Sequence, residues 1–165
     1  MIAPALVLAA LVVWAAAGVR LAVTDYRSRI LPTRLIRSTA GVVWVLYVAA
    51  ALVEGAPDGL VGAAIGGAIC GGALAVVHFA HPPSMGFGDV RLAALNGLLC
   101  GWWGWRAALA GLAAGFLVAL PEAIVTLCRE GRRASRPLGP YLVVGAGGVA
   151  VWSALTAGVV PFGGV

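Results

Sequence analysis

The stretch MGFGDVRLAALNGLLCGWW, residues 85–103, places the carboxylate of Asp89 directly before a short apolar segment, residues 90–103. As an α-helix, this segment would reach only roughly 21 Å, whereas the hydrocarbon core of a bilayer is about 30 Å thick. The segment must therefore lie in a thinned region of membrane or begin below the interface, inside protein. The second arrangement places Asp89 within the depth of the membrane, on the wall of a polar cavity.

The composition of the chain indicates a membrane protein. Of its 165 residues, 62% are hydrophobic and only 10% are charged, and the mean hydropathy is +1.02. A soluble domain carries about a quarter charged residues, so the apolar residues here are too many for one soluble core. We expect residues 1–165 to form a single transmembrane domain.

Hydropathy predicts an all-α fold, a polytopic bundle of about six transmembrane helices. Because Arg20 follows the first apolar segment instead of preceding it, we expect a retained helix there and not a signal peptide. The six predicted segments are residues 2–24, 38–53, 60–80, 90–103, 107–127 and 138–160.

The arginines predict the orientation of the bundle. Nine of the eleven, or ten with Arg20, fall on one side of it, and Arg106 falls on the other. By the positive-inside rule the arginine-rich side is cytoplasmic, which predicts a multi-pass protein of the cytoplasmic membrane with both termini outside. The basic charge is thereby assigned to orientation and not to nucleic-acid binding. We expect Trp102, Trp103 and Trp105 to lie at the outer interface.

Two of the six carboxylates, Asp25 and Asp89, are predicted to lie at the same cytoplasmic face. Asp25 closes the first apolar segment and Asp89 opens the fourth. Carboxylates at membrane depth are costly, so a functional role is the first hypothesis. Two carboxylates brought close together share a proton, and such a pair can activate water and polarise a carbonyl group. Peptide hydrolysis by this pair needs neither a metal ion nor a cofactor.

Other interpretations of these acids stay open at this point. Asp89 could cap the helix that it precedes, since acids are favoured at helix N-termini. Asp25 could pair with Arg27 or Arg29. A different functional class is also compatible with both acids: a small proton-coupled transporter or channel component, in which they bind protons or cations.

Three stretches resemble the type IV prepilin peptidases, which are membrane aspartic proteases. GFGDVRLAALNG, residues 86–97, resembles their GxGD signature and the helix after it. TDYRSRILPTRL, residues 24–35, resembles their upstream segment, with Pro32 seven residues after Asp25. RPLGPYLVVGA, residues 136–146, resembles the segment that opens their last helix. Thr33 stands where the family usually has Asn, and Arg91 stands where Lys is common.

The resemblance implies an activity and a site. Such enzymes remove a short basic leader from pilin-like precursors, after a glycine, on the cytoplasmic side. Asp25 and Asp89 would be the catalytic residues, and no cofactor or metal would be needed. Gly86 and Gly88 would permit positive φ angles and close approach of the substrate, beside Pro32. The implied partners are the precursor and the lipid bilayer; the oligomeric state is not predicted.

The first cytoplasmic loop is too short for the cysteine-rich methyltransferase region of larger relatives. The predicted segments leave only about a dozen residues there. The chain therefore resembles the compact form of the family, as in the enzymes of Flp-type (Tad) pili or the preflagellin peptidases.

The remaining residues of possible chemical interest are assigned structural roles. His78 and His81 are interpreted as interfacial groups near a helix end. Cys70, Cys100 and Cys128 form no CxxC or zinc-type pattern and are predicted to be small buried hydrophobes. Glycines at small-xxx-small spacing are predicted to let helix backbones approach; these pairs are Gly62/Gly66, Gly67/Gly71 and Gly111/Gly115.

Overall fold

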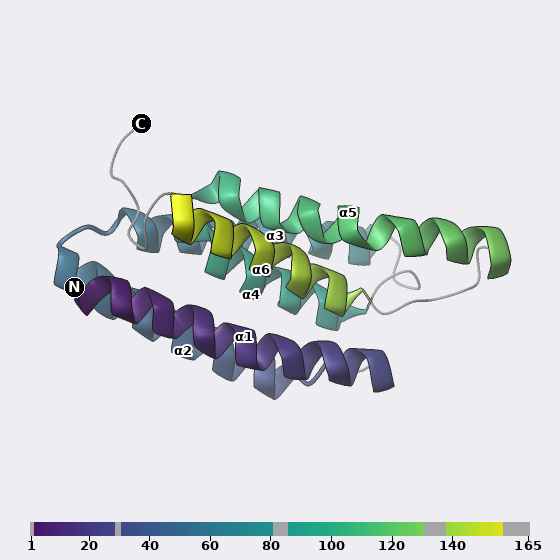
Figure 1. Ribbon diagram of the computed structural model, residues 1–165, viewed down its shortest axis with the longest axis horizontal. Coiled ribbons are helices and arrows are strands. Elements are labelled where there is room, and N and C mark those ends of the chain that lie inside the picture. The colour runs from purple at the N-terminus through teal and green to yellow at the C-terminus, as the bar shows by residue number, and fades with distance from the viewer. Residues whose placement is uncertain (1, 29–30, 81–85, 131–137, 157–165) are drawn as a thin grey trace.

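The structure is a computed structural model that describes residues 2–28, 31–80, 86–130 and 138–156 (Figure 1). These residues form helices and no strand, so the predicted all-α fold is confirmed. Every helix except α4 is long and apolar enough to cross a membrane, and the chain is a multi-pass membrane protein. The helices are α1 (Ile2–Ser28), α2 (Thr33–Glu54), α3 (Asp58–Ala80), α4 (Phe87–Gly101), α5 (Trp105–Glu130) and α6 (Gly139–Thr156).

The helices run along one long axis, and successive helices run in opposite directions (Figure 1). Helices α1 and α2 pair along one side, and α3 to α6 pack together on the other. The start of α1 and the end of α6 lie at the same end of the bundle. The end of α1 and the starts of α4 and α6 meet at the opposite end, where the candidate site lies.

The short helix α4 lies at the centre of the bundle. It contacts all five other helices, most extensively α3. Nine of its 15 residues are buried. A helix enclosed largely by protein need not match the thickness of the bilayer. Of the two arrangements that its length allows, the structure therefore favours the one inside protein.

Glycines bring the backbones of α3 and α4 into direct contact. A Cβ atom at Gly66 would lie 2.5 Å from the carbonyl oxygen of Gly97. One at Gly101 would lie 2.5 Å from the carbonyl oxygen of Gly62. The predicted packing role of Gly62 and Gly66 is confirmed, because only glycine allows two backbones to lie this close.

Several helices extend beyond the apolar segments that predicted them. Helix α1 continues four residues past 24, and α2 begins at Thr33 instead of residue 38. Pro32 is the N-cap of α2, and its carbonyl oxygen accepts the backbone N–H of Leu35 at 3.0 Å. The dozen residues predicted for the first cytoplasmic loop therefore shrink to residues 29–32. The predicted helices were too short because the apolar segments end at the first arginines, whereas the backbone hydrogen bonding of the helices continues through them.

The prediction that Trp102 lies at the membrane interface is wrong. Its side chain is 1% exposed. Its ring lies 4.5 Å, centroid to centroid, from that of Tyr47. Tyr47 on α2 also donates its hydroxyl hydrogen to the carbonyl oxygen of Leu99, at 2.9 Å. This aromatic pair fills the bundle between α2 and α4, whereas Trp105 is 48% exposed and remains a candidate interface residue.

Candidate active site

Asp25 lies in the last turn of α1, and its side chain is buried with 5% of its surface exposed. The carboxylate oxygen Oδ2 accepts the backbone N–H of Gly139, the first residue of α6, at 3.0 Å. The first N–H groups of a helix have no partner within it and carry partial positive charge, so they stabilise a carboxylate. Of the alternative partners, Arg27 is exposed to its surroundings, and Arg29 lies outside the described residues.

Asp89 lies in the first turn of α4 and is half-buried. Helix α4 begins at Phe87 with Gly86 as its N-cap, so Asp89 is inside the helix and not ahead of it. Its carboxylate accepts the backbone N–H of Gly86, in the manner of the acidic partner of a capping box. The capping interpretation therefore describes one contact of Asp89, and a carboxylate can accept further hydrogen bonds at its other oxygen.

The structure brings Asp25 and Asp89 together at one end of the bundle, close enough for the charge of one to act on the other. Asp89 is carried by α4, which is not among the helices long and apolar enough to span the membrane. Burial, and then the charge of Asp25, raise the pKa of Asp89 from 3.8 to about 6, against the lowering effect of the Gly86 N–H. Two carboxylates coupled in this way titrate as a pair that holds one proton over an intermediate pH range.

The two motif glycines differ in what they contribute. A Cβ at Gly88 would lie 2.9 Å from that of Leu31, so this glycine lets the segment before Pro32 approach the start of α4. Gly86 has a φ of −71°, and the nearest described atoms to an added Cβ would be a carboxylate oxygen of Asp89 at 3.6 Å and the backbone nitrogen of Gly88 at 3.9 Å. The expectation of positive φ angles is therefore wrong: among the described residues, only glycines outside this motif have them.

The two positions that depart from the family pattern contact each other. The Arg91 guanidinium donates to the hydroxyl oxygen of Thr33 at 2.6 Å. It also lies 4.6 Å from the centroid of the Phe87 ring, in a cation–π geometry. Arg91 thereby ties the start of α4 to the start of α2. His78 lies against Phe87, with ring centroids 5.4 Å apart; His81 lies outside the described residues.

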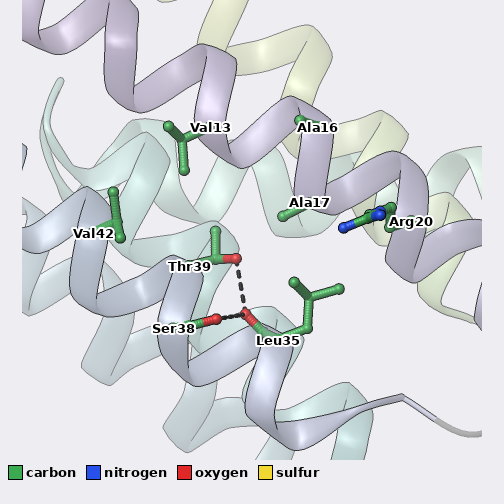
Figure 2. A pocket seen from close by; sticks show the side chains of 8 residues that line it. All are labelled: Val13, Ala16, Ala17, Arg20, Leu35, Ser38, Thr39 and Val42. Atoms are coloured by element: carbon green, nitrogen blue, oxygen red, sulfur yellow. Dashed lines mark hydrogen bonds between the residues drawn. The ribbon is translucent and has the colours of Figure 1, made fainter.

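Two outward-opening cavities lie elsewhere and are lined by neither aspartate. One, of about 380 Å³, lies between α1 and α2 and has Arg20 at its edge (Figure 2). The hydroxyl groups of Ser38 and Thr39 line it but bond to the carbonyl oxygen of Leu35, at 3.0 and 2.8 Å. The other cavity, of about 370 Å³, lies between α2, α3 and α4. The hydroxyl groups of the first cavity are already hydrogen-bonded, and neither cavity is lined by a carboxylate. Both cavities are therefore poor candidates for acid–base chemistry.

The cysteines are spread along the bundle. Within the described ranges, no three His, Cys, Asp or Glu side chains gather as a metal site would require. Cys70 and Cys100 are buried, as predicted, and their thiols donate to backbone oxygens of Ala108 and Ala146 at 3.4 Å. Cys128 is exposed, so the prediction of burial is wrong for it. Cys128 lies next to Arg129, in the last turn of α5.

The sequence did not reveal two polar contacts that organise the site. The first is the Gly139 N–H on Asp25; the sequence marked Gly139 only as part of residues 136–146, the stretch that resembles the segment opening the family's last helix. The second is Asn96, 5% exposed, in the middle of α4. Its amide oxygen accepts the indole N–H of Trp14 at 3.0 Å, and its amide nitrogen donates to the carbonyl oxygen of Leu142 at 2.9 Å. Asn96 thus fixes α4, which carries Asp89, against α1 and α6.

Comparison with known families identifies the family of the chain. The family model for the type IV leader peptidase family matches residues 7–128, about three quarters of the chain. The match includes both aspartates, Pro32 and the motif glycines, but not Gly139 or any part of α6. No curated protein and no solved structure matches the chain. Because the match covers well over half of the sequence, the chain belongs to the type IV leader peptidase family.

Proposed function

We propose that this protein is an aspartic endopeptidase in which Asp25 and Asp89 form the catalytic pair. The observation that carries the proposal is the convergence of the two acids. They lie on different helices, 64 positions apart in the sequence, yet the charge of Asp25 acts on Asp89. Each also accepts one backbone N–H, from Gly139 and Gly86 respectively, which fixes its orientation. Membership of a leader peptidase family supports peptide hydrolysis as the reaction.

The pair divides the acid–base work. Asp25 lies at the positive end of α6 and is the charged member, while Asp89 keeps the shared proton. Asp25 takes a proton from a water molecule while the oxygen of that water bonds to the peptide carbonyl carbon. At the same time Asp89 gives its proton to the carbonyl oxygen. When the C–N bond breaks, Asp25 returns its proton to the leaving amine, and a hydroxyl of the intermediate reprotonates Asp89. The enzyme is thereby restored.

The proposed substrates are pilin-like precursors with a short basic leader, a glycine and then an apolar helix. The proposed site of cleavage is after that glycine, at the cytoplasmic face, with both chain termini outside. The positive-inside rule supports this orientation, because Arg27, Arg34, Arg37, Arg91 and Arg129 all lie at the end of the bundle that holds the aspartates. An apolar substrate helix anchored in the bilayer would present its leader at this same end.

The test is cleavage of a purified pilin-like precursor in detergent micelles by wild type, Asp25→Asn and Asp89→Asn. Each variant loses one proton-transfer group and keeps its shape, so we expect at least about a 10³-fold fall in kcat/KM. Asp58→Asn is the matched control, because Asp58 is an exposed acid in the first turn of α3, at the opposite end. It should cleave at the wild-type rate.

Two outcomes contradict the proposal. The first is full cleavage by Asp25→Asn or Asp89→Asn while both variants insert and migrate as folded protein. The second is proton-linked flux in liposomes without cleavage of any precursor, which would favour the transporter hypothesis instead.

A further inference from the structure

The start of α6 meets Asp25 so closely that one residue controls the contact. Gly139 is the first residue of α6, it is buried, and its N–H donates to Oδ2 of Asp25 at 3.0 Å. Asp25 is itself buried, so this donor replaces water at one oxygen of a carboxylate that bulk solvent barely reaches.

Gly139 also has no room for a side chain, and the obstacle is Asp25 itself. A Cβ built on Gly139 would lie 2.5 Å from Oδ2, 3.1 Å from Cγ and 3.4 Å from Cβ of Asp25. These are the three nearest atoms, and all belong to the same side chain. The glycine is therefore required by the position of the carboxylate, because any other residue would have to displace it.

We propose that Gly139 is a positioning residue for catalysis, whose N–H and missing side chain together hold the Asp25 carboxylate toward Asp89. The inference rests on the proposed function for its catalytic part. Its structural part, the direct coupling of Gly139 to the Asp25 side chain, stands on the geometry alone. The acid itself lies within the matched family residues, whereas the group that orients it lies beyond them.

The first test is a double-mutant cycle on stability, with thermal unfolding in detergent of wild type, Gly139→Ala, Asp25→Ala and the double variant. In wild type the added methyl group collides with the carboxylate, and we expect the unfolding midpoint to fall by about 3–10 °C. In the Asp25→Ala background the two closest atoms are gone, so Gly139→Ala should lower the midpoint by less than about 2 °C. Gly148→Ala is the control on the same helix, because a Cβ there meets nothing within 4 Å.

The second test is steady-state cleavage of the pilin-like precursor by the single glycine variants. Gly139→Ala moves a catalytic oxygen without touching the proposed substrate, so kcat should fall about 10²-fold while KM stays within about threefold. Gly148→Ala should keep both constants. If Gly139→Ala instead caused a general loss of folding, a smaller fraction of the enzyme would be active, and the effects of Gly139→Ala and Asp25→Ala on stability would be additive.

The proposal is overturned if Gly139→Ala lowers the midpoint equally with and without the Asp25 carboxylate. It is also overturned if Gly139→Ala cleaves with the kinetics of Gly148→Ala. If wild type cleaves no precursor, the proposed function fails, whereas the stability cycle still reports whether Gly139 and Asp25 are coupled.

Discussion

Replacing Gly66 by alanine tests whether backbone contact between α3 and α4 holds the centre of the bundle together. A Cβ at Gly66 would lie 2.5 Å from the carbonyl oxygen of Gly97, 2.8 Å from Cβ of Ala108 and 3.0 Å from Cα of Gly101. These atoms belong to α4 and α5, so the methyl group is blocked by two helices at once. None of them is the far end of a flexible side chain that could turn away.

The expected magnitude follows from these distances. Carbon atoms in favourable contact lie about 3.5–4.0 Å apart, so α3 would have to retreat by about 1 Å. Overpacking of this kind costs about 1–3 kcal/mol, and occasionally more. Alanine also favours the helix over glycine by about 0.5–1 kcal/mol, which offsets part of that cost.

A matched variant removes this offset. Gly72 lies on the same helix and is exposed, and a Cβ there meets nothing within 4 Å. Gly72→Ala has the helix-propensity gain and no collision. The difference in unfolding free energy between Gly66→Ala and Gly72→Ala therefore isolates the collision, at about 1–3 kcal/mol, or roughly a 5- to 150-fold change in the unfolding equilibrium.

The assay is reversible unfolding in mixed micelles with increasing sodium dodecyl sulfate, followed by tryptophan fluorescence. We expect Gly66→Ala to unfold at a clearly lower detergent fraction than Gly72→Ala. Equal unfolding of the two variants would refute the reasoning, because it would mean that α3 and α4 are held apart or can separate without cost.

Two further predictions concern the site and its orientation. The pKa of Asp89 is raised from 3.8 to about 6 in the folded protein, so its carboxylate destabilises the fold increasingly as the pH rises through that window. Asp89→Asn should therefore be more stable than wild type at pH 7.5, by at most about 3 kcal/mol, and equal to it near pH 4; a pH-independent difference in unfolding would contradict this. Cys128 is exposed whereas Cys70 and Cys100 are buried, so a membrane-impermeant maleimide should label one thiol in inverted vesicles and none in intact spheroplasts. Labelling of the intact spheroplasts would reverse the proposed orientation.

The hydropathy of the chain predicted the number of helices because each apolar segment, including the short one at residues 90–103, is separated from the next by polar residues. It could not predict the ends, because a helix continues wherever its backbone hydrogen bonds continue. The arginine-containing start of α2, at Thr33, is the clearest case. Arg34 and Arg37 stopped the apolar segment but not the helix, since exposed arginines are good helix formers.

Topology predicted that Asp25 and Asp89 share one end of the bundle, and the motifs indicated them as the candidate catalytic residues. What it could not predict is which backbone groups bind each carboxylate, because these contacts depend on how helices rotate against one another. Trp102 shows the same limit. A tryptophan near the end of an apolar segment is typical of an interface, yet here Tyr47 of a distant helix covers it.

The carboxylate pair depends on a helix, α6, that lies outside the residues matched by the family model. Asp25 and Asp89 fall within the matched residues, but the donor to Asp25 comes from α6, beyond residue 128. Asn96 reaches the same helix through the carbonyl oxygen of Leu142, so α6 holds both α1 and α4. A site built in this way gains precision from rigid helices, because each acid is fixed by a backbone group that cannot rotate away. The two aspartates supply the proposed chemistry, and the start of α6 supplies the backbone donor that orients one of them.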